Sequence, residues 1–481
     1  MKVMLLFPKW TSAYGLFSYF AKKASRWPPL NLAYIAAVAE NNGHMVKIVD
    51  GEAEDLPTAK ILERINEFKP DIIGMTATTP FFHVVVKLAE AIKGFNKSIP
   101  IAIGGAHITI LQKEDFNLCF DYAFLGEAEE SWAQFLDRYG SGKDMSDIKG
   151  LLYRKGDEVV CTGLSEPIKN IDSIPYPARH LLKLDKYNIG TLKGVKNFTT
   201  IMTTRGCPFE CIFCSTKVFG SRIRRRSLDS VMDEIKSIIY NFNIKHFTFL
   251  DDTLTLDRNY ILQLCKRIQA EDFSITFDGS TRANLVDDEL IAEMAKAGLI
   301  RISFGLESVD PRIRKIIKKE VPLESYQKAN QITNKYGIET LNSVMLGLPG
   351  ETAETVESTL GYLRNARHIQ QANLSIATPY PGTELYRMAK EGQHGLRLLT
   401  EDFSRYRRYG SAVMEVNELS AQDLIDLQND GFLRIYSAPW RIIPMVRKSG
   451  ILGALLTFSR LAKKIKRQLR VKKATKDNNS N

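Results

Sequence analysis

Short runs of apolar residues alternate with segments of helical period over the first 140 residues of the chain. This pattern predicts strands at residues 3–7, 45–49, 71–76, 99–103 and 122–125, and helices near 30–42, 57–68, 81–95 and 127–139. Continuous apolar strands separated by helices are typical of a parallel sheet covered on both faces, so we expect a doubly wound, Rossmann- or flavodoxin-like α/β fold. Such sheets bind ligands beyond the carboxyl ends of their strands, where the sequence reads FPKW, TATTP, IGGAHIT and FLGEAEE.

A second alternation of the same kind starts at Phe198. It predicts strands at residues 198–203, 246–250, 274–277, 301–304, 339–346 and 373–377, with a helix after each of the first five. Six such units are too few for a closed eightfold barrel, so the pattern favours a partial, TIM-like (β/α)6 barrel.

The segment between the two alternations is rich in Gly, Pro and mixed polarity, with one predicted hairpin around residues 154–157. We therefore expect a ligand-binding domain at 1–140, a connector at 141–197, a barrel at 198–390 and a C-terminal helical region at 391–481.

Composition is that of a globular chain, with 44% hydrophobic and 25% charged residues in 481 positions. A chain of this length exceeds what one core organises, which supports two or three domains. The N-terminal MKVMLLFP is too short for a signal peptide, so we expect a cytoplasmic protein. Twelve Lys and Arg against one acid, Asp477, follow position 440, so the net charge of +11 belongs to the tail.

Three of the six cysteines, Cys207, Cys211 and Cys214, cluster in RGCPFECIFC directly after the first barrel strand. The other three are scattered and predicted to be buried thiols: Cys119, Cys161 and Cys265. A structural zinc site needs four ligands, and neither Cys nor His stands nearby as a fourth. A cubane iron–sulfur cluster held by three thiolates keeps one iron open to an exogenous ligand. The missing fourth ligand therefore favours an iron–sulfur cluster at the catalytic face of the barrel.

The spacing C-x3-C-x2-C, with Phe213 before the last cysteine, resembles the signature of the radical S-adenosylmethionine (SAM) superfamily. The resemblance implies a 4Fe–4S cluster on Cys207, Cys211 and Cys214, whose open iron is chelated by the methionyl amino and carboxylate groups of SAM. It further implies that an electron from the cluster cleaves the sulfonium to give a 5'-deoxyadenosyl radical, so that the three cysteines form the catalytic centre.

The remaining barrel strands end in segments that resemble the cobalamin-binding and methylthiotransferase branches of this superfamily: FLDDTLTLD, FDGSTRAN, ISFGLES, SVMLGLPGE and ATPYPGTELY. Three glycines in them would let backbone approach a nucleotide closely: Gly305, Gly347 and Gly350. Glu307 is expected to accept hydrogen bonds from SAM and Arg282 to pair with its carboxylate, or the two form a structural ion pair. Asp251 and Asp252 position SAM or substrate, or one of them caps a helix.

The first domain, with GGAHIT and FLGEAEESW, looks like the cobalamin-binding domain that precedes the barrel in one large subgroup, a resemblance that covers residues 1 to about 440. The expected cofactor-binding residues are Thr76, Gly104, Gly105, His107, Gly126 and Glu127, with further hydroxyls from Thr78 and Thr79. Family members that ligate cobalt through histidine carry D-x-H-x-x-G after the first strand, whereas this chain reads FPKWTSAYG. The cofactor is therefore expected base-off without a protein histidine on cobalt. His107 contacts the corrin or its phosphate, or is a satisfied surface histidine.

The resemblance favours a methyltransferase that acts on an unactivated carbon of a small molecule, with flavodoxin or ferredoxin as electron donor. A radical cyclase or oxidoreductase similar to the oxidative cyclase of bacteriochlorophyll synthesis is the alternative. A tRNA methylthiotransferase would need three more N-terminal cysteines and an RNA-binding barrel, which the sequence lacks. A non-catalytic iron–sulfur or zinc module that binds nucleic acid would leave the polar barrel mouth unexplained, so no nucleic-acid partner is expected.

The tail places apolar residues on one helical face: Ile451, Leu455, Phe458, Ala462, Ile465 and Leu469. Its uncharged stretch, 449–459, is about half of the roughly 20 residues needed to span a bilayer. Packing on the barrel explains the apolar face but not the dense positive charge, whereas an anionic membrane surface satisfies both. We therefore expect peripheral binding to the inner face of the membrane and a lipid or other membrane-associated substrate.

Overall fold

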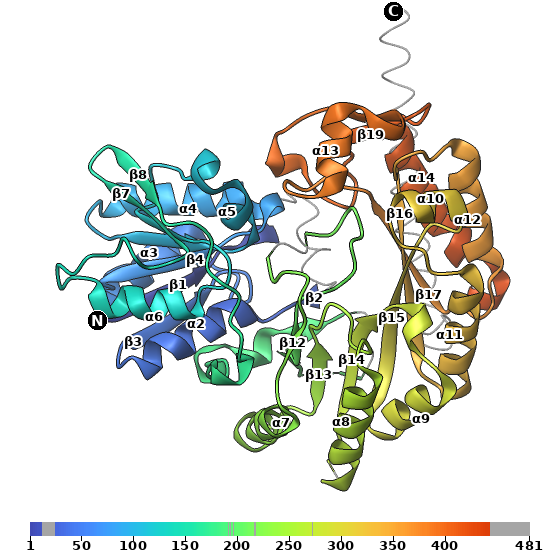
Figure 1. Cartoon of the computed structure of the whole chain (residues 1–481), viewed down its shortest axis with the longest axis horizontal. Coiled ribbons are helices and arrows are strands. Elements are labelled where there is room, and N and C mark those ends of the chain that lie inside the picture. Colours follow the sequence, from blue (N-terminus) through green and yellow to red (C-terminus); the bar gives the residue numbers. More distant parts are fainter. Residues whose placement is uncertain are drawn as a thin grey trace, which may run out of the picture.

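The computed structural model describes residues 1–11, 25–190, 192, 194–195, 197–215, 218–271 and 273–442. They form a smaller α/β lobe, blue to cyan in Figure 1, and a larger lobe coloured green to orange. The basic tail, from which peripheral membrane binding was inferred, lies outside the described residues, and so does most of the loop after the first strand.

The first sheet has seven strands in the order β3-β1-β4-β5-β6-β7-β8. Their bounds are β1 (Lys2–Phe7), β3 (Met45–Asp50), β4 (Ile72–Thr76), β5 (Ile101–Gly104), β6 (Tyr122–Phe124), β7 (Leu151–Lys155) and β8 (Glu158–Cys161). The first five are parallel in the flavodoxin-like order, so the predicted fold class is confirmed. The strand order reverses between β1 and β4, which places a ligand crevice at their carboxyl ends.

Helices cover both faces of this sheet (Figure 1). Helices α2 (Leu30–Asn41) and α6 (Glu129–Arg138) share one apolar core, while α3 (Thr58–Phe68) and α4 (Phe82–Phe95) share the core on the other face. The shorter elements η2 (Thr79–Phe81), α5 (Ala106–Leu111) and η3 (Gln112–Asp115) follow β4 and β5. The helical period did not predict α5, because six residues are too few to show it.

The connector is fastened to both lobes. Its predicted hairpin forms β7 and β8, which extend the first sheet antiparallel to β6. Three short turns, η4 (Ile171–Ser173), η5 (Arg179–Leu181) and η6 (Leu184–Lys186), lead to β9 (Asn188–Ile189), which pairs with β2 (Ser25–Arg26). The Tyr187 hydroxyl donates to the buried carboxylate of Asp50 in the first lobe at 2.8 Å. Burial raises the pKa of Asp50 to about 6.

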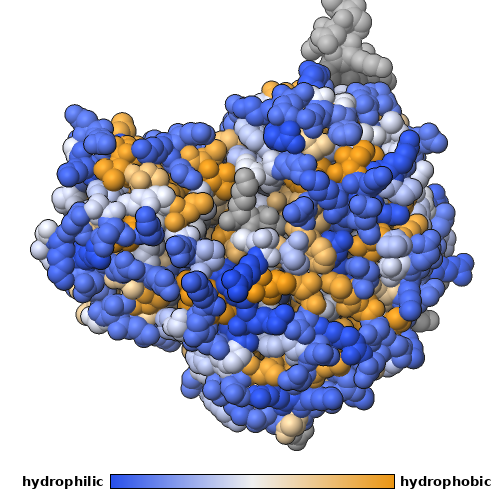
Figure 2. All heavy atoms as spheres, in the orientation of Figure 1, coloured by the Kyte–Doolittle hydropathy of each residue, from blue (hydrophilic) through white to orange (hydrophobic). Residues whose placement is uncertain are grey.

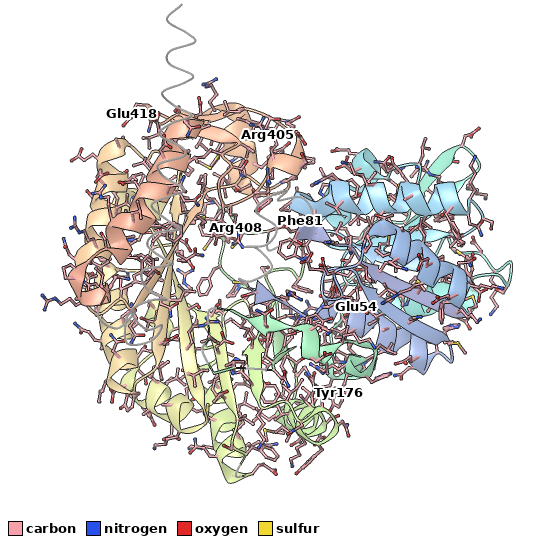
Figure 3. The ribbon with its side chains drawn as sticks, turned by 180° about the vertical axis from the view of Figure 1, so that it is seen from behind. Glu54, Phe81, Tyr176, Arg405, Arg408 and Glu418 are labelled. Atoms are coloured by element: carbon pink, nitrogen blue, oxygen red, sulfur yellow. The ribbon has the colours of Figure 1, made fainter. Side chains whose placement is uncertain are left out.

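On the other side, the connector reaches the barrel through a buried charge triad. Arg179 of η5 lies 2.6 Å from Glu234 of helix α7 (Leu228–Phe242), and Arg226 pairs with the second oxygen of the same carboxylate. All three side chains are at most 6% exposed. Tyr176, labelled in Figure 3, donates its hydroxyl to the carbonyl of Ser230 in α7 at 3.0 Å. The segment between the domains is thus packed structure rather than a free linker.

The second sheet has six parallel strands in chain order, as predicted. They are β10 (Thr199–Ile201), β13 (His246–Phe249), β14 (Thr276–Thr281), β15 (Leu299–Glu307), β16 (Glu339–Leu346) and β17 (Gln371–Ile376). The connecting helices lie along the outer side of the curved sheet in Figure 1: α7 (Leu228–Phe242), α8 (Arg258–Ala270), α9 (Asp288–Lys296), α10 (Pro311–Ile316), α11 (Leu323–Lys335) and α12 (Ala353–Asn365). The first and last strands are edges, so the barrel is partial.

After β17 the chain forms α13 (Glu384–Glu391), η8 (Gln393–Gly395), β18 (Leu396–Leu398), η9 (Phe403–Arg405), β19 (Met414–Val416) and α14 (Ala421–Tyr436). The expected helical region therefore begins with an antiparallel β18-β19 pair. The η9 segment reaches back to the first lobe, where the Phe403 ring lies edge-on 5.5 Å from His107. Figure 3 shows Arg405 of η9, and Arg408 three residues further along the chain, across from Phe81 of the first lobe.

Hydrophilic residues predominate on the face in Figure 2, and hydrophobic ones form separate patches. Among the described residues, none of the helices has the length and apolarity required to traverse a bilayer.

Candidate active site between the lobes

The three clustered cysteines lie in a loop closed by a short antiparallel neck. Strands β11 (Thr204–Arg205) and β12 (Arg224–Arg225) pair so that Arg205 stands opposite Arg224. The described residues between them, 206–215 and 218–223, belong to the cysteine loop. Gly206 has φ +96°, and a Cβ there would lie 2.4 Å from the carbonyl oxygen of Arg222. The chain can therefore enter the loop only with glycine at this crossing. Two-residue strands carry no periodic signal, so the sequence did not predict this neck.

The cysteine thiols lie in unlike surroundings. Cys211 is buried, and its sulfur accepts from Nη1 of Arg282 at 3.9 Å. The sulfur of Cys207 lies 3.9 Å from Oγ1 of Thr253. Cys214 is at the exposed edge of the loop, yet shielding of its sulfur, together with the neighbouring Cys211 thiol, raises its pKa to about 12. Burial also raises the pKa of Cys211, so loading iron must displace protons from these thiols.

This donor set fits an iron–sulfur cluster better than a single ion. In the part of the chain that the structure describes, no group of three or more His, Cys, Asp or Glu side chains converges on one ion. A tetrahedral zinc ion requires such convergence, whereas a cubane binds each thiolate at a different iron. Three thiols on one loop, with no fourth Cys or His beside them in the sequence, match a cubane with one open iron.

Beside this loop, β15 ends in a strained turn that holds an ion pair. Glu307 has φ +62° and follows a register shift between β15 and β16. Its carboxylate accepts from Nζ of Lys319 at 2.7 Å, and that ammonium lies 5.7 Å from the Phe213 ring. A Cβ on Gly305 would lie 2.3 Å from Nζ of Lys319, so the pair occupies the space above this glycine. Burial opposes the charge of Lys319, but the Glu307 carboxylate raises its pKa.

Arg282 does not pair with Glu307, so the alternative of a structural ion pair between these two residues is wrong. Its guanidinium instead stacks on Phe209 of the cysteine loop, with Cζ 3.8 Å from the ring centroid. The buried Nε of Arg282 has no hydrogen-bond partner within the described residues. An unused donor beside Cys211 suits the expected pairing of Arg282 with an anionic group.

A cavity of about 500 Å³ lies between the lobes. The first lobe lines it with the carboxyl ends of β1, β4, β5 and β6 and the start of α2, including Thr76, Thr78, Gly104, Gly105, Gly126 and Glu127. The barrel lobe contributes Met202, Arg205, Val218, Phe219 and Leu250. Val218 and Phe219 belong to the cysteine loop, so the cavity and the cluster site share one wall.

Two segments of the chain match known families. Residues 201–363 match the radical SAM superfamily, and residues 19–136 match the B12 binding domain. An uncharacterized methyltransferase of Pyrococcus horikoshii is 33% identical over 442 residues, which span 91% of this chain and 93% of that protein. The chain belongs to the cobalamin-binding radical SAM family.

Other proteins that this chain resembles are named for different reactions. The anaerobic magnesium-protoporphyrin IX monomethyl ester cyclase of Rubrivivax gelatinosus is 28% identical over 448 residues, covering 91% of this chain and 77% of the cyclase. The radical SAM methyltransferase TsrM of Kitasatospora setae, solved with cobalamin and a 4Fe–4S cluster, shares the fold at a TM-score of 0.69 and 17% identity. That match covers 91% of this chain and 88% of TsrM. These relatives are enzymes, and the chain is a member of an enzyme family.

The cavity residues fit a cobalamin of this family. The walls combine apolar and aromatic side chains with a few polar groups, which suits a large cofactor with an apolar body and polar rim. Gly105 has φ +102°, and a Cβ there would lie 2.5 Å from the carbonyl oxygen of Ala77, so only glycine keeps β4 and β5 this close. The described lining residues include no histidine. Base-off binding without a histidine ligand stays a prediction.

His107 lies outside the cavity lining. It is 1% exposed, so the surface-histidine alternative is wrong. Its Nδ1 lies 3.1 Å from Oγ1 of Thr79 and its Nε2 2.7 Å from Asp115, while its ring packs 4.0 Å from Phe82. Both ring nitrogens are therefore engaged within the first lobe, and the expected contact with the corrin gains no support.

Gly347 and Gly350 adopt positive φ values of 86° and 79°. The N–H groups of Gly347 and Leu348 donate to Glu351 at 2.8 and 3.1 Å. A Cβ on Gly347 would lie 2.9 Å from Leu424 of α14, so packing against this helix already requires glycine. Burial raises the pKa of Glu351 to about 8.

Asp251 and Asp252 do not cap a helix, because α8 is capped by Asp257, whose side chain accepts from the N–H of Tyr260. The buried carboxylate of Asp251 accepts from the N–H of Thr203 at 2.7 Å and so fixes the end of β10 before the neck. Burial raises the pKa of Asp251 to about 6. Asp252 is exposed.

Sequence reasoning missed three charged residues at the site: Lys319, which pairs with Glu307, and Arg205 and Arg224, which pair with Glu127 far away in the chain. Lys319 stands in KKE, which belongs to no motif quoted for cofactor binding, and Arg224 likewise lies outside those motifs. The sequence signal nearest to them is the arginine directly before the Gly-Cys of the cysteine motif, which is Arg205.

Proposed function

We propose that this enzyme transfers a methyl group to an unactivated carbon of a small, largely hydrophobic substrate and depends on cobalamin. The observation that carries the proposal is the shared wall described above, in which Val218 and Phe219 of the cysteine loop line the cavity. A cofactor in that cavity would touch the loop that carries Cys207, Cys211 and Cys214. Identity of 33% to a methyltransferase over nearly the whole chain supports the same reaction class.

The position of each residue supports a separate role in binding the cofactors. A bound cluster, SAM and cobalamin supply one-electron cleavage of SAM and a carrier for the methyl group. The three cysteines would hold the cluster, with Arg282 available to an anionic group and Glu307, fixed by Lys319, available to donors of SAM. Thr76, held by Nδ2 of Asn31 at 2.8 Å, offers a fixed hydroxyl at the cavity wall.

The wall that faces the barrel also supports a hydrophobic substrate. Met202, Val218, Phe219 and Leu250 are apolar, and Leu250 is 38% exposed at the end of β13. Apolar walls exclude water from the space between the lobes, which protects reactive species from side reactions. The further proposal of a lipid substrate and a peripheral position on the membrane rests on the tail sequence.

The same geometry supports a proposal for electron entry and for cobalt ligation. Cys214 is the exposed member of the trio, so a flavodoxin or ferredoxin of the cytoplasm would deliver its electron at this edge of the loop. With no histidine among the described lining residues, we propose base-off cobalamin. Its cob(II)alamin electron paramagnetic resonance (EPR) spectrum should lack superhyperfine splitting from an axial imidazole nitrogen.

A radical cyclase or oxidoreductase without net methyl transfer is the second candidate, supported by the cyclase relative that matches 91% of this chain. Reconstituted enzyme, methyl-deuterated SAM and extract of a deletion strain separate the two. Incorporation of the labelled methyl group into one extract compound supports the methyltransferase. An unlabelled product that has lost two hydrogens would reject methyl transfer and favour the second candidate.

A further inference from the structure

Glu127 of the first lobe holds both strands at the neck of the cysteine loop. Its Oε2 accepts from Nη1 of Arg205 in β11 at 3.0 Å and from Nη1 of Arg224 in β12 at 2.8 Å. Its Oε1 accepts from Nη2 of Arg224. Because the two arginines stand opposite each other in the neck, one carboxylate joins the strands that enter and leave the loop.

This contact is removed from water. The side chains of Glu127, Arg205 and Arg224 are 2%, 5% and 6% exposed, respectively. Arg205 also reaches Glu129 at 2.5 Å, and Arg224 donates to the carbonyl of Phe219 in the returning half of the loop at 2.8 Å. Buried, bidentate charge pairs of this kind fix orientation, because either charge left alone is strongly unfavourable.

Several of these side chains, though not Arg224, form part of the cavity wall. Glu127, Glu129, Arg205 and Phe219 all line it, and the Arg205 guanidinium lies 5.4 Å from the ring centroids of both Phe219 and Tyr34. A cofactor that fills the cavity therefore meets the groups that hold the loop.

We propose that Glu127 is a positioning residue that fixes the neck of the cluster-bearing loop and couples its geometry to occupancy of the cavity. This role differs from the direct cofactor contact that the family resemblance implied for Glu127. The coupling rests on the proposed function, since it needs a cofactor in the cavity, whereas the fixing of the loop does not. By reciprocity, a loaded cluster tightens cobalamin binding by the same factor as cobalamin stabilises the loaded loop.

The first test uses the full chain without cobalamin, reconstituted anaerobically with iron and sulfide. Glu127→Gln and Arg224→Gln should shift the EPR spectrum and midpoint potential of the reduced cluster and accelerate iron loss to a chelator several-fold. Glu54→Gln is the matched control: Glu54 lies in the first lobe (Figure 3) and binds Arg64 through both oxygens at 2.7 and 2.9 Å, away from the cavity lining. A folded Glu127→Gln protein with wild-type spectrum, potential and iron retention overturns the proposal.

Arg224→Gln keeps the proposal testable if Glu127→Gln does not fold, because it leaves Glu127 paired with Arg205. Combining it with Glu127→Gln closes a double-mutant cycle. If the two residues act through their mutual contact, the double variant should lose iron no faster than the worse single variant. If instead the two substitutions multiply each other's effect on the rate of iron loss, the residues act independently. That outcome would overturn the proposal that they act through one shared contact.

The second test measures coupling with hydroxocobalamin as the probe. Wild-type protein should bind it at least about fivefold more tightly with the cluster than without, a ratio typical of coupled sites. In Arg224→Gln the ratio should approach one. A wild-type ratio of one, or an unchanged ratio in the variant, overturns the coupling. If wild-type protein binds no cobalamin at all, the proposed function fails, while the cluster spectra still decide whether Glu127 positions the loop.

Discussion

The ammonium of Lys319 lies 2.7 Å from the carboxylate of Glu307, and both side chains are at most 10% exposed. The pair sits where β15 leaves its regular register, at a residue whose backbone is left-handed. Such strain persists only where the surroundings enforce it, and it concentrates at functional sites. The ion pair therefore holds the strained end of β15 beside the cysteine loop.

Lys319→Ala should lower the free energy of unfolding by about 3–5 kcal/mol, because the Glu307 charge would stay buried without a partner. Adding Glu307→Gln should recover much of this loss, since no isolated charge then remains. Urea denaturation of the metal-free protein measures both variants. An equal loss in the single and double variants would contradict the pairing.

Replacing Cys207, Cys211 or Cys214 by Ala should abolish the cluster and SAM cleavage, because two thiolates do not hold a cubane with an open iron stably. The matched control replaces Cys119, Cys161 and Cys265 together; they are buried or half-buried in the cores of the two lobes. Iron analysis and 5'-deoxyadenosine production are the measurements. Wild-type iron content in Cys211→Ala would reject the cluster assignment.

Glu351 should make stability fall as pH rises between about 4.5 and 8. Its carboxyl has an ordinary pKa of 4.5, and burial in the folded chain raises this pKa to about 8. Within that window the folded chain binds a proton that the unfolded chain has lost, so raising the pH favours unfolding by at most about 1.4 kcal/mol per pH unit. Below and above it, both states carry the same charge on this residue.

Glu351→Gln keeps an acceptor for the N–H groups of Gly347 and Leu348 but cannot ionise. Its melting temperature should therefore vary less with pH than that of the wild type inside the window and run parallel outside it. Asp251, with a pKa of about 6, remains in both proteins and cancels in the comparison. Identical pH profiles would show that Glu351 titrates normally.

Gly105→Ala should destabilise the first lobe by about 1–3 kcal/mol, because an alanine is strained at the positive φ of this position. It should also weaken cobalamin binding, because the new Cβ would press on Ala77 in the cavity wall. Gly94→Ala is the control, since a Cβ at this α4 position meets nothing within 4 Å. The control should gain about 0.5–1 kcal/mol. Thermal denaturation and a cobalamin titration distinguish the two glycines.

Full-length protein should float with anionic vesicles and lose this binding in high salt or on truncation after Pro444. Each basic residue of the tail is worth about 1 kcal/mol near anionic headgroups. Vesicles without anionic lipid are the control. Equal flotation of the truncated protein, or binding to RNA in place of vesicles, would remove the support for a lipid substrate.

The parallel strands of both sheets could be predicted because buried parallel strands are continuous apolar runs, and the cysteine motif could be predicted because its ligands lie close together in the sequence. The neck strands β11 and β12 and the helix α5 could not be predicted, because two-residue strands and a six-residue helix are too short to show a repeating pattern. Glu127 illustrates the remaining gap. Its motif pointed to the cavity, but its contacts with Arg205 and Arg224 depend on how two lobes meet, and no local pattern encodes that.

The contacts that the connector makes with both lobes affect how quickly a cofactor can enter and leave the cavity. Bending the lobes apart at this segment would break the hydrogen bond from Tyr187 to Asp50 and the contact of Arg179 with Glu234. The buried charged side chains of Asp50, Arg179 and Glu234 would then lose these partners. A hinge of that kind is slow compared with the local opening of short segments. A large corrinoid is thus expected to enter and leave through fluctuations of the chain around the cavity, and its residence time should be long.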